Sequence, residues 1–169
     1  MIWTFFQSPD PRLVISWATD SDIDHHVRIF DSTGAEICHL YYSNDECLGS
    51  SLDTDSGVRD SELLSLFINS WQIRFKGFGP ETITIGDVTS GYKYLYFVTN
   101  YDETPLFDDG VNCVATVYGP NNAGSVQVPI VGTEKYFLVG CFETFDNFQF
   151  ITQNNNVPDE PSAYPAECP

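Results

Sequence analysis

Apolar residues alternate with polar ones, or run together, in nine short stretches of this chain of 169 residues. Alternation with a period of two is typical of a half-buried β-strand, and the Gly, Pro, Asn and Asp residues between the stretches favour turns. The expected strands cover residues 12–18, 25–31, 36–42, 81–87, 92–100, 112–119, 125–131 and 135–142, with a last strand at 147–153. Short connections between them are typical of antiparallel neighbours. The pattern predicts an all-β protein, an antiparallel β-sandwich of about 8–9 strands.

One segment departs from the strand pattern and predicts a single short helix, over about residues 60–71. Its apolar residues follow helical spacing, and a residue that can cap the first turn precedes them. These apolar positions are Leu63, Leu64, Phe67, Ile68 and Trp71, and the candidate caps are Asp60 and Ser61. We expect this helix to cover one edge or one end of the sandwich.

The length of the chain fits one domain, which we place at residues 1–153 with the helix as an insertion. Residues 154–169 contain four prolines and almost no apolar side chains, so they cannot form a core of their own. We interpret this tail as a linker, or as an extended arm that docks on a neighbour.

The charge of the chain is strongly negative, with 24 acidic residues against seven basic ones and a formal net charge of −17. So few Lys and Arg residues cannot form a phosphate-binding surface, which argues against a nucleic-acid partner. The same field attracts divalent cations. No apolar run approaches the length that a membrane-spanning helix needs, so we expect no membrane span.

Five cysteines without C-x-x-C spacing argue against a structural zinc site and favour two disulfides with one odd thiol. Local pairing would join Cys38 to Cys47 across a turn, and neighbouring strands would join Cys113 to Cys141. Cys168 would then be free or bonded to another chain. The alternative is a cytosolic protein in which all five cysteines are reduced.

A cluster of acids and histidines, TDSDIDHHVRIFDSTG, fills residues 19–34. In an extended strand the side chains alternate between faces, so Asp24, His26 and Arg28 share one face. The other face carries His25, Val27 and Ile29, of which the two aliphatic residues belong in the core.

A second acidic group, SLDTDSG at residues 51–57, repeats the spacing of two aspartates separated by one residue. Two such pairs supply carboxylate oxygens of the kind that Ca²⁺ prefers. The expected calcium ligands are Asp22, Asp24, His26, Asp53, Asp55 and Glu81. Two alternatives stay open: each pair alone can form an Asx turn, or His26, with His39 as a further ligand, can hold a transition metal such as Zn²⁺.

The motifs SDIDHHV, YYSND, LDTD, GFGPETITI and GYKYLYFVTNYDE follow one another in an order that resembles the YfaP-like family. The resemblance covers most of the chain from residue 13 to about residue 142. It implies a β-sandwich module of secreted and surface proteins, often beside adhesive domains, and brings no established reaction. This chain departs from the family pattern by inserting residues 56–78 before GPETITI.

These observations favour a non-catalytic, extracellular module for adhesion or structural assembly, such as a subunit of a filament or surface layer. In this hypothesis calcium stiffens the loops at one end, and strand edges and the tail contact a protein partner or another copy. The alternative is a carbohydrate-binding module, with Tyr41, Tyr42, Trp71 and Tyr101 as the residues that contact the sugar. A hydrolase is the third class; no G-x-S-x-G or H-E-x-x-H motif supports it.

Overall fold

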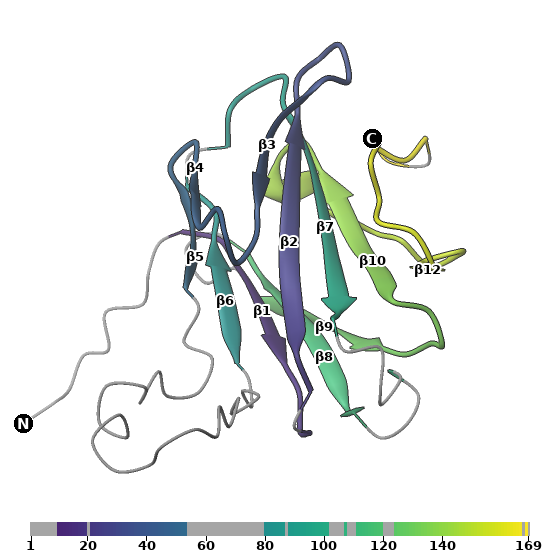
Figure 1. Cartoon of the computed structure of the whole chain (residues 1–169). Helices are drawn as coiled ribbons and strands as arrows, with labels where there is room; N and C mark the ends of the chain where they lie inside the picture. Colours follow the sequence, from purple (N-terminus) through teal and green to yellow (C-terminus); the bar gives the residue numbers. More distant parts are fainter. Residues whose placement is uncertain are drawn as a thin grey trace, which may run out of the picture.

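The structure is a computed structural model that describes residues 10–19, 21–53, 80–86, 88–101, 107, 111–119, 124–166 and 168. Two antiparallel sheets form a β-sandwich (Figure 1). Sheet A consists, in spatial order, of β4 (Glu46–Cys47), β5 (Ser50–Asp53), β6 (Glu81–Thr84), β1 (Arg12–Ser16), β8 (Cys113–Tyr118) and β9 (Ser125–Ile130). Sheet B consists of β11 (Gln149–Phe150), β10 (Tyr136–Phe142), β7 (Lys93–Asn100), β2 (Ile23–Phe30) and β3 (Glu36–Leu40), and β12 (Asn156–Val157) also pairs with β10.

The predicted all-β sandwich is confirmed, and a strand overlaps each of the nine predicted stretches. Three short strands were not predicted: β4 before the second acidic group, β5 overlapping its start, and β12 in the tail. The predicted helix over residues 60–71 lies outside the described residues. Among the described residues, no helix is long and apolar enough to cross a membrane.

The main core lies between the two sheets and is built from alternate residues of their strands. Leu13 and Ile15 of β1 and Ile83 of β6 contribute from sheet A, and all three are fully buried. Val27 and Ile29 of β2 face them from sheet B and are equally buried, as the alternation in this strand predicted. Burial of these aliphatic side chains is the main favourable contribution to folding.

A second, smaller apolar cluster lies in sheet B and includes Phe30, Leu95, Phe97 and Leu138. In β7 its members alternate with residues of the main core, so the cluster occupies the outer face of the sheet. The C-terminal segment, yellow in Figure 1, covers this face and contributes Tyr164, whose ring meets the edge of the Phe30 ring at 5.8 Å between centroids. Both faces of sheet B are therefore partly covered, which explains the nearly continuous burial along β2 and β7.

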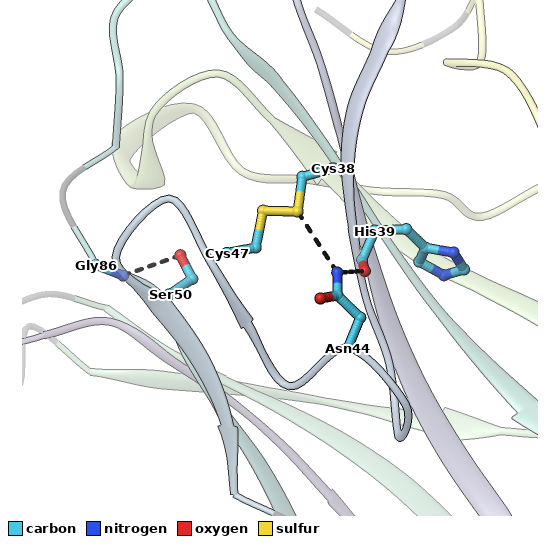
Figure 2. Close-up of a disulfide and its surroundings, with 6 residues drawn as sticks. All are labelled: Cys38, His39, Asn44, Cys47, Ser50 and Gly86. Atoms are coloured by element: carbon cyan, nitrogen blue, oxygen red, sulfur yellow. Dashed lines mark hydrogen bonds between the residues drawn. A yellow bond between two sulfur atoms is a disulfide. The ribbon is translucent and has the colours of Figure 1, made fainter.

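The first disulfide joins Cys38 of β3 to Cys47 of β4, as predicted (Figure 2). Because β3 belongs to sheet B and β4 to sheet A, this bond fastens the two sheets together at one edge. In the intervening turn, Asn44 donates a hydrogen bond of 2.6 Å to the carbonyl oxygen of His39. The ring of His39 points away from the disulfide, as successive side chains of a strand do.

The second disulfide joins Cys141 of β10 to Cys168, and Cys113 is the free cysteine. The predicted bond between Cys113 and Cys141 is therefore wrong. Cys113 lies in β8 of sheet A and belongs to the core between the sheets, whereas Cys141 belongs to the outer cluster of sheet B. Cys168 is also neither free nor bonded to another chain, because it holds the tail against its own domain.

Candidate functional site

The predicted calcium ligands are divided between the two sheets. Asp24 lies in β2 of sheet B, where its backbone pairs with Thr99, whereas Asp53 and Glu81 lie in β5 and β6 of sheet A. Among the described residues, one group of three candidate ligands has its ligand atoms within 4.8 Å of one another, and it consists of His26, His39 and Glu160. It contains none of the predicted acids. Asp55 lies outside the described residues, so the calcium site stays a prediction.

Glu81 is the acid whose environment is most altered, because its side chain is buried at the start of β6. Burial, followed by the negative charges of Asp24 and Asp22, raises the pKa of Glu81 from 4.5 to about 8. Its Oε2 lies 3.6 Å from Nε2 of His25, and full burial lowers the pKa of that imidazole to about 3. The three carboxylates therefore influence one another electrostatically.

The two histidines of the zinc alternative meet on the outer face of sheet B. His26 of β2 and His39 of β3 lie on neighbouring strands, and Nδ1 of His26 forms a hydrogen bond of 3.0 Å with Nε2 of His39. The His26 ring stacks on Phe97 at 4.7 Å between centroids, and the His39 ring stacks on Tyr41 at 4.7 Å. Burial, then the charges of His39, His25 and Arg28, lowers the pKa of His26 to about 3, so this ring is neutral at physiological pH.

A network of charged groups adjoins the histidine pair and connects the tail to sheet B. The Arg28 guanidinium donates through Nη1 to Glu36 of β3 and through Nη2 to Glu160 of the tail. The Glu160 carboxylate also lies 4.0 Å from Nδ1 of His39. The tail thus brings a carboxylate to the histidine pair.

A pocket of about 340 Å³ opens beside these groups on the same face. This volume lies at the lower end of the range for small-molecule sites in proteins. Its walls combine aromatic rings, carboxylates, a hydroxyl and a lysine: Asp24, His26, His39, Tyr41, Tyr42, Thr99, Tyr101, Lys135, Tyr136 and Glu160.

Two buried polar atoms of the pocket have no hydrogen-bond partner among the described residues. They are Nε2 of His26, a residue only 7% exposed, and Oγ1 of Thr99, a residue 3% exposed. A buried polar atom without a partner is uncommon in proteins and costs free energy, and a bound ligand, ion or water can satisfy it. Both atoms have almost no accessible surface, so neither faces the open space of the pocket, although both residues line it.

Three of the four aromatic residues predicted to contact a sugar line this pocket. Tyr42 is 62% exposed and Tyr101 is 54% exposed, so a large part of each side chain faces solvent, while the rings of Tyr41 and Tyr42 pack edge to face at 5.3 Å. The Lys135 ammonium lies 5.2 Å from the centre of the Tyr101 ring. Trp71, the fourth predicted residue, lies outside the described residues.

Four further residues of the pocket were not among the predicted site residues: Thr99, Lys135, Tyr136 and Glu160. Thr99 and Tyr136 pair directly across β7 and β10, and Lys135 immediately precedes β10. Alternation in the strand 92–100 indicates which face Thr99 shares, but it does not indicate which strands are neighbours. Glu160 carries no signal in the sequence, because its position depends on the docking of the tail.

Comparison of the chain with protein-family models, with curated proteins and with solved structures found no match. The resemblance to the YfaP-like family therefore stays an expectation from the motifs, and the site must be interpreted from its own chemistry.

Proposed function

We propose that this protein is a non-catalytic, extracellular β-sandwich module that binds a carbohydrate in the pocket on the outer face of sheet B. One observation carries the proposal: exposed tyrosines and polar side chains, among them a carboxylate and a lysine, line a single pocket of about 340 Å³. A sugar ring has an apolar face of C–H groups and a rim of hydroxyls. It therefore needs both kinds of contact at once.

The tyrosines supply the apolar contact. The rings of Tyr42 and Tyr101 are more than half exposed, so a sugar ring can stack on them without any rearrangement of the core. The carboxylate of Asp24 supplies an acceptor and the ammonium of Lys135 supplies a donor. Asp24 lies in β2 and Lys135 immediately precedes β10, so regular strands hold both groups in place.

An extracellular location is supported by the two disulfides, because such bonds persist in oxidising compartments. Adhesion through a bound glycan agrees with this location. Assembly through the tail receives less support, because Cys168 and Glu160 make their contacts within the same chain.

The experiment is a glycan array followed by calorimetric titration of the best glycan in the presence of a chelator. The variants are Tyr42→Ala, which removes an exposed ring, and Tyr42→Phe, which keeps the ring and removes only the hydroxyl. Loss of one stacking contact of about 1.4 kcal/mol lowers the affinity about tenfold. We expect this loss for Tyr42→Ala, and a much smaller change for Tyr42→Phe.

The matched control is Val126→Ala, which truncates a side chain of similar exposure (52%) in β9 of sheet A, remote from the pocket. It should leave the affinity unchanged. Binding to no glycan at millimolar concentration would contradict the proposal, and so would equal affinities of Tyr42→Ala and the wild type. Hydrolysis of the bound glycan would contradict its non-catalytic part.

A further inference from the structure

The histidine pair of the pocket has the geometry of two metal ligands. Nδ1 of His26 and Nε2 of His39 are 3.0 Å apart. Two nitrogens bound to one tetrahedral Zn²⁺ lie about 3.3 Å from each other, given Zn–N bonds of about 2.0–2.1 Å. A small rotation of the rings, which separates the two nitrogens slightly, exchanges the hydrogen bond between them for a shared metal ion.

The hydrogen bond between the rings requires that one of the two facing nitrogens carries a lone pair. Nδ1 of His26 and Nε2 of His39 lie 3.0 Å apart, and one of them accepts from the other. A neutral imidazole coordinates a metal through such a lone pair.

The third ligand is Glu160, brought to the pair by the docked tail. Its carboxylate and the two rings offer one ligand atom each, and these atoms all lie within 4.8 Å of one another. Arg28 adds one positive charge beside them, but it contacts two carboxylates, those of Glu36 and Glu160. Arg28, Glu36 and Glu160 together therefore carry one net negative charge, which does not oppose the entry of a cation.

The three residues also line one pocket, so an ion held between them can be reached from solvent.

We propose that His26, His39 and Glu160 bind a divalent transition-metal ion, with Zn²⁺ as the best fit, and leave one coordination position open toward the pocket. Two imidazoles and one carboxylate, with a fourth position open, are a known ligand set of zinc. Imidazole also suits Cu²⁺ and Ni²⁺, whereas Ca²⁺ requires several oxygen ligands. This site is therefore distinct from the predicted calcium site, and it does not depend on the binding of a sugar.

The test is calorimetric titration of the metal-free full chain with Zn²⁺, repeated with Co²⁺, whose visible absorption reports a four-coordinate site. We expect one ion per chain and a rise in the melting temperature, because the ion binds the folded state. In the histidine ¹⁵N spectrum, the signals of His26 and His39 should shift on addition of Zn²⁺, while the signal of the core residue His25 should not.

The variants are His39→Gln and Glu160→Gln, each of which removes one ligand and keeps a side chain of similar size. Loss of a residue that only supports a ligand weakens metal binding by about 10–100-fold, so we expect each of these variants, which lose a ligand, to weaken Zn²⁺ binding by at least about tenfold. The larger loss is expected for His39→Gln. The matched control is Glu36→Gln, which removes the other carboxylate that Arg28 contacts but supplies no ligand. It removes the same charge as Glu160→Gln but no ligand, so it should weaken Zn²⁺ binding clearly less than Glu160→Gln does.

Absence of Zn²⁺ binding would overturn this inference, and so would equal affinities of the wild type, His39→Gln and Glu160→Gln. Either result leaves the carbohydrate proposal standing, because the sugar titrations are performed in a chelator.

Discussion

Removal of the disulfide between Cys141 and Cys168 is expected to destabilise the whole domain. The two residues are separated by 27 positions in the chain. In the chain-entropy description, closing a loop of that length restricts the unfolded chain and contributes about 3.5 kcal/mol to stability. We therefore expect the double variant Cys141→Ala, Cys168→Ala to lose about this free energy of unfolding.

The folded state of this variant should open only at the end of the chain. Asn156 anchors the preceding segment, since it accepts a hydrogen bond of 2.9 Å from the backbone N–H of Glu134 and donates one of 2.9 Å to the carbonyl of Tyr136. Residues up to 157 should keep their protection from hydrogen exchange. Residues 158–168 should lose theirs, and Glu160 should leave the pocket with them.

The assay is urea unfolding followed by far-UV circular dichroism, with peptide-resolved hydrogen exchange as the local measurement. The matched control is the variant Cys38→Ala, Cys47→Ala, whose disulfide spans nine positions and contributes about 2.5 kcal/mol by the same reasoning. A variant of Cys141 and Cys168 as stable as the wild type would refute the view that the tail belongs to the cooperative unit. A larger loss of unfolding free energy in the variant of Cys38 and Cys47, whose disulfide closes the shorter loop, would refute the loop-length argument.

Three further predictions concern the inside of the sandwich. Because the pKa of Glu81 rises to about 8, the folded protein holds a proton that the unfolded chain has lost, so stability should fall as the pH rises from 6.5 to 8. The net fall should be about 1 kcal/mol, because the buried histidines of β2, whose pKa values are lowered, oppose it in the lower part of this window. Glu81→Gln should abolish this alkaline decline in urea unfolding at several pH values; a decline that persists would assign it to other groups. Gly86→Ala should lower stability by about 1–3 kcal/mol, because its Cβ would lie 2.1 Å from the backbone oxygen of Gly49, and an unchanged melting temperature would contradict this close approach. Cys113 is buried, and burial raises the pKa of its thiol, so a thiol reagent should modify no cysteine in the native protein. After unfolding without reductant, the reagent should modify one cysteine per chain. More than one modified cysteine would contradict the two disulfides.

The longer strands could be predicted because apolar residues that face the core alternate with polar residues that face outward along several consecutive positions. In β2, Val27 and Ile29 point into the core while His26 and Arg28 face outward, as the period of two requires. The short strands β4, β5 and β12 were missed, since each has only two to four residues and no longer alternating stretch of the sequence contains it.

The site could be predicted only in part, because its residues come from strands whose neighbours are set by the folded sheet. Tyr41 and Tyr42 adjoin one another in the sequence, and their exposure follows from the turn that they begin. The contact of His26 with His39 depends on the register between β2 and β3. The contribution of Glu160 depends on a tail whose own composition predicts no packing and whose position is fixed by a disulfide 27 residues in span.

The most direct test of the central claim is an NMR titration of the tyrosine ring signals with the glycan that the array selects. The account predicts saturable shifts of Tyr41, Tyr42, Tyr101 and Tyr136, the four tyrosines of the pocket, with little change at Tyr118 in β8 of sheet A. If the ring signals of the four pocket tyrosines stay unchanged while the glycan binds, or if Tyr118 responds instead, the ligand binds elsewhere and the proposed role of this pocket is wrong.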